Sequence, residues 1–221
     1  MAQATRSAHR TTAISDDPLE NFTTWLQINA KPVGIVVGVL AIATAAILVF
    51  RASEASKRER ASMALYTAQA PLNEGKLPEA ATELQKVVQR YGGTLAGQQA
   101  ALLLAQVNYE QGKFAEGLAA LEKARGDASR EFAASMDGLI AAGHESMGNH
   151  DKAAEAFASA AREAEHTTDR IQYEASQARA LMAAGKLEAA KEIWTRLASD
   201  ETQPFAQEAR VRLGEIAGAG K

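Results

Sequence analysis

Cysteine is absent from the 221 residues, so disulfides, thiolate zinc sites and thiol catalysis are excluded. Aromatic residues are scarce, at 5%, whereas alanine makes up about 22% of the chain. Because alanine is the best helix former and is poor in strands, this composition argues against β-sandwiches and barrels and favours closely packed helices. The net charge of only -3 indicates neither a basic surface for nucleic acid nor an acidic tail.

Catalytic and cofactor motifs are also missing. His144 and Glu145 begin like the helical zinc-protease motif, but Gly148 stands where the second histidine is required. There is no phosphate-binding glycine loop ending in Lys and Ser or Thr, and no Gly-x-Ser-x-Gly elbow. The sequence therefore predicts a protein that is not an enzyme, with no metal and no cofactor.

One long run carries no charge at all. Residues 33–50 read VGIVVGVLAIATAAILVF, and as a helix they would be about 27 Å long, close to the ~30 Å of a bilayer's hydrocarbon core. A cleaved signal peptide is the alternative, but the run exceeds the ~7–15 apolar residues usual there. We interpret residues 33–50 as a single transmembrane helix.

Two segments precede this run. Residues 1–17 have few large apolar groups and are expected to be disordered. Residues 18–32 form a juxtamembrane segment, in which Pro18 suits a first helical turn and Asp17 a cap. We interpret it as a short helix at the membrane surface, with an irregular leader as the alternative. Its expected apolar face is Leu19, Phe22, Trp25 and Leu26.

The segment after the run favours a continuous helix. After Phe50 the chain has no proline until Pro71 and no glycine until Gly75. Residues 51–61 are therefore expected to form a helical stalk that joins the span to the domain of residues 62–221.

Residues 62–221 repeat themselves. Four glycines recur at spacings of 37, 36 and 37 residues, each with an alanine seven positions before it and a large apolar residue nine positions after it. A repeat of this length is typical of solenoids. The glycines are Gly75, Gly112, Gly148 and Gly185, and the large apolar residues are Leu84, Leu121, Phe157 and Trp194.

This pattern predicts stacked helical hairpins. Glycine permits the tight turn within a hairpin, small residues let two helices approach, and hairpins must stack because one alone cannot bury its apolar face. Thr94, Asp127 and Thr168 stand where helix N-caps are expected. After Pro204, one last amphipathic helix would close the array with a polar outer face. The expected fold is thus all-α.

The unit is similar to the tetratricopeptide repeat over roughly residues 60–200. Its period is two to three residues longer than the standard 34. The usual proline at the end of each repeat is missing, His150 replaces an aromatic residue, and Gly117 replaces alanine. These departures weaken the register of the second and third repeats but leave the array intact.

A narrower resemblance covers almost the whole chain. Trp25 precedes the span, ERASMALYTAQ follows it, and then comes YGGTLAGQQAALLLAQ. This arrangement resembles the YfgM-like family, an ancillary subunit of the SecYEG translocon. The resemblance implies a bacterial inner-membrane protein whose repeats lie in the periplasm. It also implies association with the translocon and with a PpiD-type membrane-anchored chaperone, assisting newly translocated proteins without catalysis.

The flanking charges disagree with that topology. Of the basic residues before the span only Lys31 is close to it, whereas four follow at once, and the positive-inside rule places the more basic side in the cytoplasm. We expect a periplasmic repeat domain from the resemblance, with a cytoplasmic one as the alternative. The basic residues are Arg6, Arg10 and Lys31 before the span, and Arg51, Lys57, Arg58 and Arg60 after it.

The first helix of each hairpin is expected to line a concave face that binds a peptide or a partner's helix. Tyr109 and Met182 would give adaptable apolar contacts, and Arg179 could pair with a carboxylate; the alternative is that Tyr109 and Met182 are ordinary packing residues. The predicted partner-binding residues are Gln69, Asn73, Gln106, Tyr109, Glu110, Glu145, Arg179 and Met182.

The span carries a second candidate contact. Gly34 and Gly38 are four residues apart, a spacing that lets helices pack closely in lipid, although glycine is also simply common in spans. Two functions follow: a membrane-tethered scaffold that assists secreted proteins at the translocon, or an accessory subunit that stabilises another membrane complex through its span and repeat domain.

Overall fold

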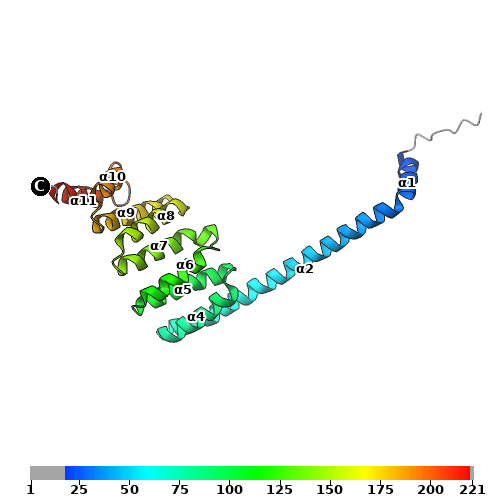
Figure 1. Cartoon of the computed structure of the whole chain (residues 1–221), viewed down its shortest axis with the longest axis horizontal. Helices are drawn as coiled ribbons and strands as arrows, with labels where there is room; N and C mark the ends of the chain where they lie inside the picture. Colours follow the sequence, from blue (N-terminus) through cyan, green and yellow to red (C-terminus); the bar gives the residue numbers. More distant parts are fainter. Residues whose placement is uncertain (1–17, 220–221) are drawn as a thin grey trace, which may run out of the picture. The chain divides into compact units, whose positions relative to one another are not determined.

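The computed structural model describes residues 18–219, and every regular element within that range is an α-helix (Figure 1). The predicted all-α class is confirmed. The chain divides into two units, with the boundary between Glu54 and Ala55, inside helix α2 (Ala30–Ala68). The disorder predicted for residues 1–17 lies outside the described residues.

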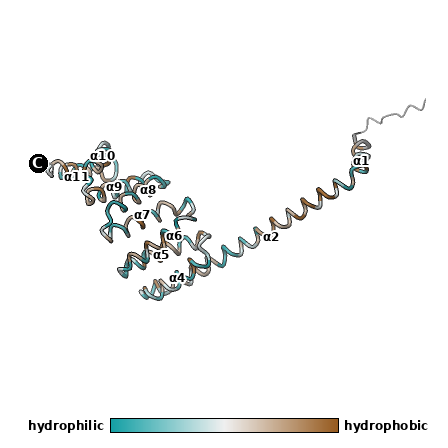
Figure 2. Tube along the Cα trace, in the orientation of Figure 1, coloured by the Kyte–Doolittle hydropathy of each residue, from teal (hydrophilic) through white to brown (hydrophobic). Residues whose placement is uncertain are grey.

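The first unit contains α1 (Pro18–Ile28) and the apolar part of α2. One helix near the N-terminus, which includes residues 33–50, is long and apolar enough to cross a membrane, and none of its most apolar stretch is buried (Figure 2). The rings of Phe22 and Trp25 on α1 stack at 6.4 Å and are exposed. Asn29 separates the two helices, and its side-chain amide donates to the Trp25 carbonyl oxygen at 2.9 Å.

The second unit is a stack of helical hairpins. The first hairpin joins the end of α2 and the short α3 (Ala70–Asn73) to α4 (Leu77–Tyr91), and a single helix closes the far end. The second helix of each hairpin packs against the first helix of the next. The later helices are α5 (Leu95–Glu110), α6 (Phe114–Arg125), α7 (Arg130–Ser146), α8 (His150–Glu163), α9 (Thr167–Ala183), α10 (Leu187–Ala198) and α11 (Ala206–Ala219).

The hairpin turns are built alike. Gly75, Gly112, Gly148 and Gly185 have φ angles of 73°, 73°, 75° and 77°. This is the left-handed region, which costs glycine little. The N–H of the residue after each glycine donates to the carbonyl five residues earlier, as Lys113 does to Asn108 at 2.8 Å. These bonds satisfy the free carbonyls of the first helix, so glycine fixes where each hairpin bends.

The repeated apolar positions form the core. Leu84, Leu121 and Trp194 are 0% exposed, and Phe157 is 7% exposed. The alanines seven positions before the turns are also buried, which allows the paired helices to approach closely. Each large side chain contributes about 1.5–3 kcal/mol of burial, so the stack is held by contacts that recur once per repeat.

The predicted helix starts are partly right. Thr94 caps α5, accepting a hydrogen bond on its hydroxyl from the Gly97 N–H at 3.1 Å. Asp127 is not a cap: α7 begins after Ser129, and the carbonyl oxygen of Asp127 instead accepts from the Gln98 side chain at 3.0 Å. Thr168 is also wrong, because α9 already begins at Thr167.

The last helix closes the array, as predicted. Ala206, Ala209 and Ile216 on α11 are buried, and α11 packs against α10. Its outer side carries charge, including Arg210 and Glu215. The C-terminal end of the stack is thus apolar inside and polar outside.

Candidate peptide-binding groove

A groove of about 410 Å³ crosses three successive repeats on the side formed by their first helices. Leu102 and Gln106 come from α5, the middle of α7 supplies three residues, and α9 supplies three more. Phe157 of α8 completes the lining. The residues from α7 and α9 are Ser135, Gly138, Leu139, Gln172, Tyr173 and Ser176.

The groove is polar without being charged. Among the described residues that line it, none carries a formal charge. Gln106 and Gln172 offer amides that both donate and accept. The Ser135 hydroxyl is hydrogen-bonded to Tyr173, and the Ser176 hydroxyl accepts from Arg179 at 3.4 Å, so each has hydrogen-bonding capacity left for one further contact. Leu102, Leu139 and Phe157 supply apolar surface. Such a lining suits the backbone and small apolar side chains of an extended peptide.

The Tyr173 ring packs in the groove against Gly138 on α7, which has no side chain there. A Cβ added at Gly138 would lie 2.7 Å from Cε1 of the Tyr173 ring, so glycine makes room for the ring. Burial raises the pKa of the Tyr173 phenol, and Asp169 raises it further. The phenol therefore stays protonated and can donate a hydrogen bond.

Tyr109 is bonded to the backbone of Leu139, one of the residues that line the groove. Its hydroxyl donates to the Leu139 carbonyl oxygen at 3.1 Å, and its ring packs beside Phe114 at 5.7 Å. Burial, and next Glu122, raise the pKa of the Tyr109 phenol to about 12. Half-buried and bonded to α7, Tyr109 acts between repeats more than toward a ligand.

A buried ion pair fixes the helices around the groove. Arg125 of α6 donates to both carboxylate oxygens of Asp137 on α7, at 2.7 and 3.0 Å. Ser159 of α8 donates to the same carboxylate at 2.7 Å, and Asp137 is only 6% exposed. Three helices from two repeats thus meet at one carboxylate.

Of the predicted partner-binding residues, Gln106 lines the groove, and Tyr109 is bonded to the backbone of Leu139 in its lining. Asn73 and Glu110 are exposed at the ends of α3 and α5, and Gln69 is half-buried at the break before α3. Their partner-binding role stays a prediction.

The three predicted residues nearer the C-terminus have contacts of their own. Arg179 donates to both oxygens of Glu208 on α11, at 2.8 and 2.6 Å, and its guanidinium lies 5.4 Å from the centre of the Phe205 ring. Met182 accepts a hydrogen bond on sulfur from Trp194 Nε1 at 3.3 Å. Burial raises the pKa of the Glu145 carboxyl, while His150 and Arg179 lower it.

Most groove residues are absent from the predicted set because that set covers only the end of each first helix, near the turn, whereas the groove lies toward the middle of α7 and α9. The predicted residues lie two to six positions before the turn glycines, whereas Ser135, Gly138 and Leu139 lie nine to thirteen positions before Gly148. Extending the row of Gln106 backward at helical spacing would have found them.

A larger hollow of about 560 Å³ lies between α4 and α6. It spans two repeats rather than three, and charges of both signs line it, including Arg90, Glu116 and Lys123. Mixed charges are usual on solvated second helices. Within residues 18–219 no cluster of His, Cys, Asp or Glu could hold a metal ion.

Comparison with known proteins agrees with this geometry. The profile of a family described as a tetratricopeptide repeat-like domain matches residues 23–139 and again residues 64–174. None of the curated proteins compared with the chain matches it.

Two solved structures have a similar fold. Both are of a putative kinesin light chain from Podosopora anserina with nearly identical TPR-like repeats, the second being a substituted form. The first is 17% identical, with a TM-score of 0.58, over 74% of this chain and 88% of that one. The second is 18% identical, with a TM-score of 0.57, over 74% and 87%. At such identity the likeness shows the fold alone.

Proposed function

Because the chain belongs to the tetratricopeptide repeat-like domain family, we propose that it is a non-catalytic scaffold that binds extended segments of other polypeptides. The observation that carries this proposal is the uncharged groove across α5, α7 and α9. Amides and hydroxyls recognise peptide backbone, which every polypeptide has, so the groove suits many clients at modest affinity.

We place this scaffold at a membrane. Residues 33–50 would anchor it, and α1 would lie at the interface through Phe22 and Trp25. The resemblance to the YfgM-like family supports work at the SecYEG translocon, beside a PpiD-type chaperone, with the repeats in the periplasm of a bacterial inner membrane.

Protease digestion tests the orientation. In spheroplasts, added protease should degrade residues 62–221 without permeabilisation. The basic residues after the span favour the opposite orientation, so protection of the repeat domain until the membrane is lysed would overturn the periplasmic placement and remove the translocon's periplasmic side as the partner.

Peptide binding tests the groove. A fluorescein-labelled, uncharged, extended peptide should bind the full chain in detergent, and Gln106→Leu with Gln172→Leu should weaken binding by about fivefold or more, since each removes a backbone hydrogen bond. Gln85→Leu, on the exposed side of α4, is the matched control. Equal binding by all the variants would contradict the assignment.

A second candidate function is an accessory subunit held through the span. A Cβ added at Gly34 or Gly38 meets nothing within 4 Å in the described chain, so both positions are open to another helix. Under this proposal, Gly34→Leu with Gly38→Leu releases the protein from a membrane complex on native gels, whereas the groove variants do not. Under the scaffold proposal, the groove variants weaken binding of the partner, whereas the Gly34 and Gly38 variants do not.

A further inference from the structure

In the second and third repeats, matching positions on the first helix belong to the hydrophobic core that this helix shares with the preceding one. On α5, Ala100 and Leu103 lie in the cluster that includes Leu84 of α4. On α7, Met136 and Leu139 lie in the cluster that includes Leu121 of α6. Ala100 and Met136 are both 0% exposed. These positions of the first helix are therefore a contact surface that recurs from one repeat to the next.

In the first repeat the same positions are bare. Counting 37 residues back from Ala100 and Leu103 gives Met63 and Tyr66 on α2, which are 65% and 77% exposed. They are three residues apart, so they share a face of the helix. Single exposed apolar side chains are common on protein surfaces, but apolar side chains that group together mark interaction sites.

The two ends of the stack differ. At the C-terminal end α11 buries Ala209 and Ile216 and turns its charges outward. At the N-terminal end α2 is the first helix of the second unit, and Met63 and Tyr66 face away from its buried residues Ala61, Leu65 and Ala68. The array is closed at one end and open at the other.

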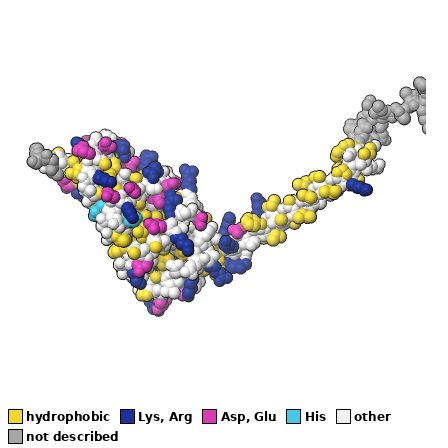
Figure 3. Space-filling view, viewed as in Figure 1, with side chains coloured by type: hydrophobic (Ala, Val, Ile, Leu, Met, Phe, Trp, Pro, Cys, Tyr) yellow, Lys and Arg dark blue, Asp and Glu magenta, His cyan; other side chains and the backbone are white. Residues whose placement is uncertain are grey.

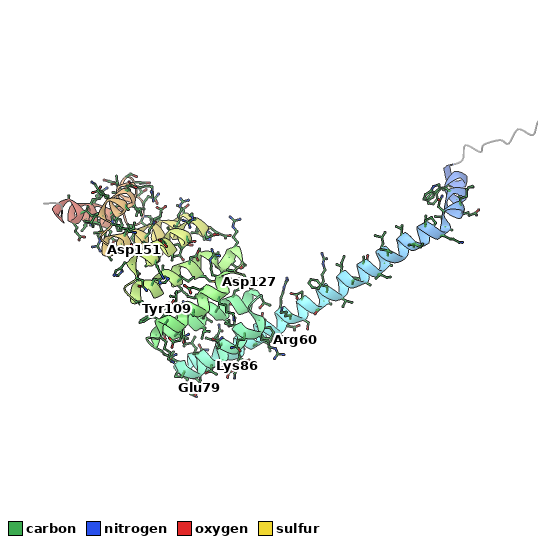
Figure 4. The ribbon with its side chains drawn as sticks, in the orientation of Figure 1. Arg60, Glu79, Lys86, Tyr109, Asp127 and Asp151 are labelled. Atoms are coloured by element: carbon green, nitrogen blue, oxygen red, sulfur yellow. The ribbon has the colours of Figure 1, made fainter. Side chains whose placement is uncertain are left out.

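Basic side chains border this open end. A hollow of about 280 Å³ between α2 and α4 is lined by Thr67, Lys86 and Arg90, among others. Figure 4 shows Arg60 and Lys86 at this end of the array, on α2 and α4, and Figure 3 shows Lys and Arg gathered there. Arg60 donates to the Ser56 hydroxyl, and Arg90 lies over the Tyr91 ring. Glu59 and Glu83 are the nearby acids, with Glu83 paired to Lys86 at 2.6 Å.

We propose that this open end docks an amphipathic α-helix of a partner protein. A helix is the occupant because each later first helix packs against the second helix before it, as α5 does on α4 and α7 on α6, so the partner would extend an interface that the fold already uses. Its apolar side would pack on Met63 and Tyr66, and its carboxylates would face Arg60 and Arg90.

Photocrosslinking in native membranes tests the proposal on the full chain. Benzoylphenylalanine in place of Tyr66 should give an adduct with one partner, at residues spaced three or four apart on the apolar side of a helix that also carries acids. Arg60→Glu with Arg90→Glu should reduce the yield by about tenfold. The same photoprobe in place of Val211, exposed on α11, gives the background.

Other outcomes overturn the proposal. Adducts with copies of the chain, adducts with lipid alone, adducts outside a helix, or a yield no higher than at Val211 would each do so. Met63→Ser with Tyr66→Ser should leave the melting temperature of the isolated chain unchanged, and a marked fall would show that these residues pack internally. Because the groove lies on α5, α7 and α9, Gln106→Leu with Gln172→Leu should leave the Tyr66 adduct intact, so the two proposals fail separately.

Discussion

The hydroxyl of Tyr109 on α5 donates a hydrogen bond to the carbonyl oxygen of Leu139 on α7, at 3.1 Å. The ring reaches that carbonyl because Gly117 on α6 and Gly143 on α7 have no side chain in its path. One aromatic residue therefore joins three helices of two adjacent repeats. Gly117, which departs from the repeat pattern, is one of the two glycines that leave room for this ring.

Gly143→Ala should destabilise the protein. The added methyl would overlap the Tyr109 hydroxyl, and such overpacking costs about 1–3 kcal/mol. Replacing a helical glycine by alanine gains about 1 kcal/mol, so the net loss is smaller than the clash alone. Urea unfolding of the full chain in detergent measures it. Gly214→Ala on α11 is the control, because its Cβ meets nothing within 4 Å, and it should stabilise. A gain at both positions would contradict the packing.

The repeat was predictable because its signals are local. Glycine at Gly75 and its three equivalents fixes a left-handed turn by backbone geometry alone, and Leu84 or Trp194 follows at a spacing that places it inside the hairpin. Helix starts were less predictable. Asp127 has a capping side chain, but the Gln98 amide holds the Asp127 carbonyl and the Ser129 N–H, and this contact across 31 residues moves the start of α7.

Asp137→Ala should be among the most destabilising single changes. It leaves the Ser159 hydroxyl without its acceptor and the half-buried Arg125 guanidinium with only Glu163, 3.5 Å away, and losing these hydrogen bonds to a buried carboxylate costs about 1–3 kcal/mol. Thermal unfolding measures the loss. Glu188→Ala is the matched change, because its pair with Lys191 is exposed, at 3.5 Å, and should cost ~0–0.5 kcal/mol. Similar losses at the two sites would show that the Asp137 pair is not structural.

The groove itself was harder to predict than the fold. Gln106 was recognised from its place on a first helix, but Tyr173 and Gly138 come together only once α7 and α9 are stacked. Arg179 has a contact that the sequence of its own repeat does not reveal. Its position suits a free concave surface, yet the last helix of the array supplies Glu208 to pair with it. Neither contact can be predicted from the sequence of a single repeat.

Stability should fall as the pH is lowered through the range of histidine titration. His144 is 7% exposed, and burial, followed by Lys152, lowers its pKa below the usual 6.5. The unfolded chain then binds a proton more readily than the folded one. The stabilisation from neutral His144 is fully present above the pKa that this histidine has in the unfolded chain. It is lost as the pH falls from about 6.5 toward the lower pKa of His144 in the folded protein.

Melting curves at several pH values test this. His144→Leu should flatten the slope of melting temperature against pH between about 5 and 7. His166→Gln, at an exposed position, should leave the slope of the unchanged protein in place. A slope that persists after His144→Leu would assign the pH dependence to another group.

The contact between Glu208 and Arg179 gives the capping helix a pH dependence in a lower range. Arg179, through hydrogen bonding, lowers the pKa of the Glu208 carboxyl, and Arg212 lowers it further. The stabilisation is therefore present above the usual value of about 4.5 and is lost as the pH falls through the lowered folded value.

Both side chains are about a third exposed, so screening limits the pair to about 1 kcal/mol. Glu208→Gln should cause that loss at pH 7 and a smaller one at about pH 3, below the usual pKa of glutamate, as followed by urea unfolding. Glu201→Gln, whose pair with Arg210 is exposed, should change little at either pH. If the two variants behave alike, α11 is held by Ala209 and Ile216 without help from the ion pair.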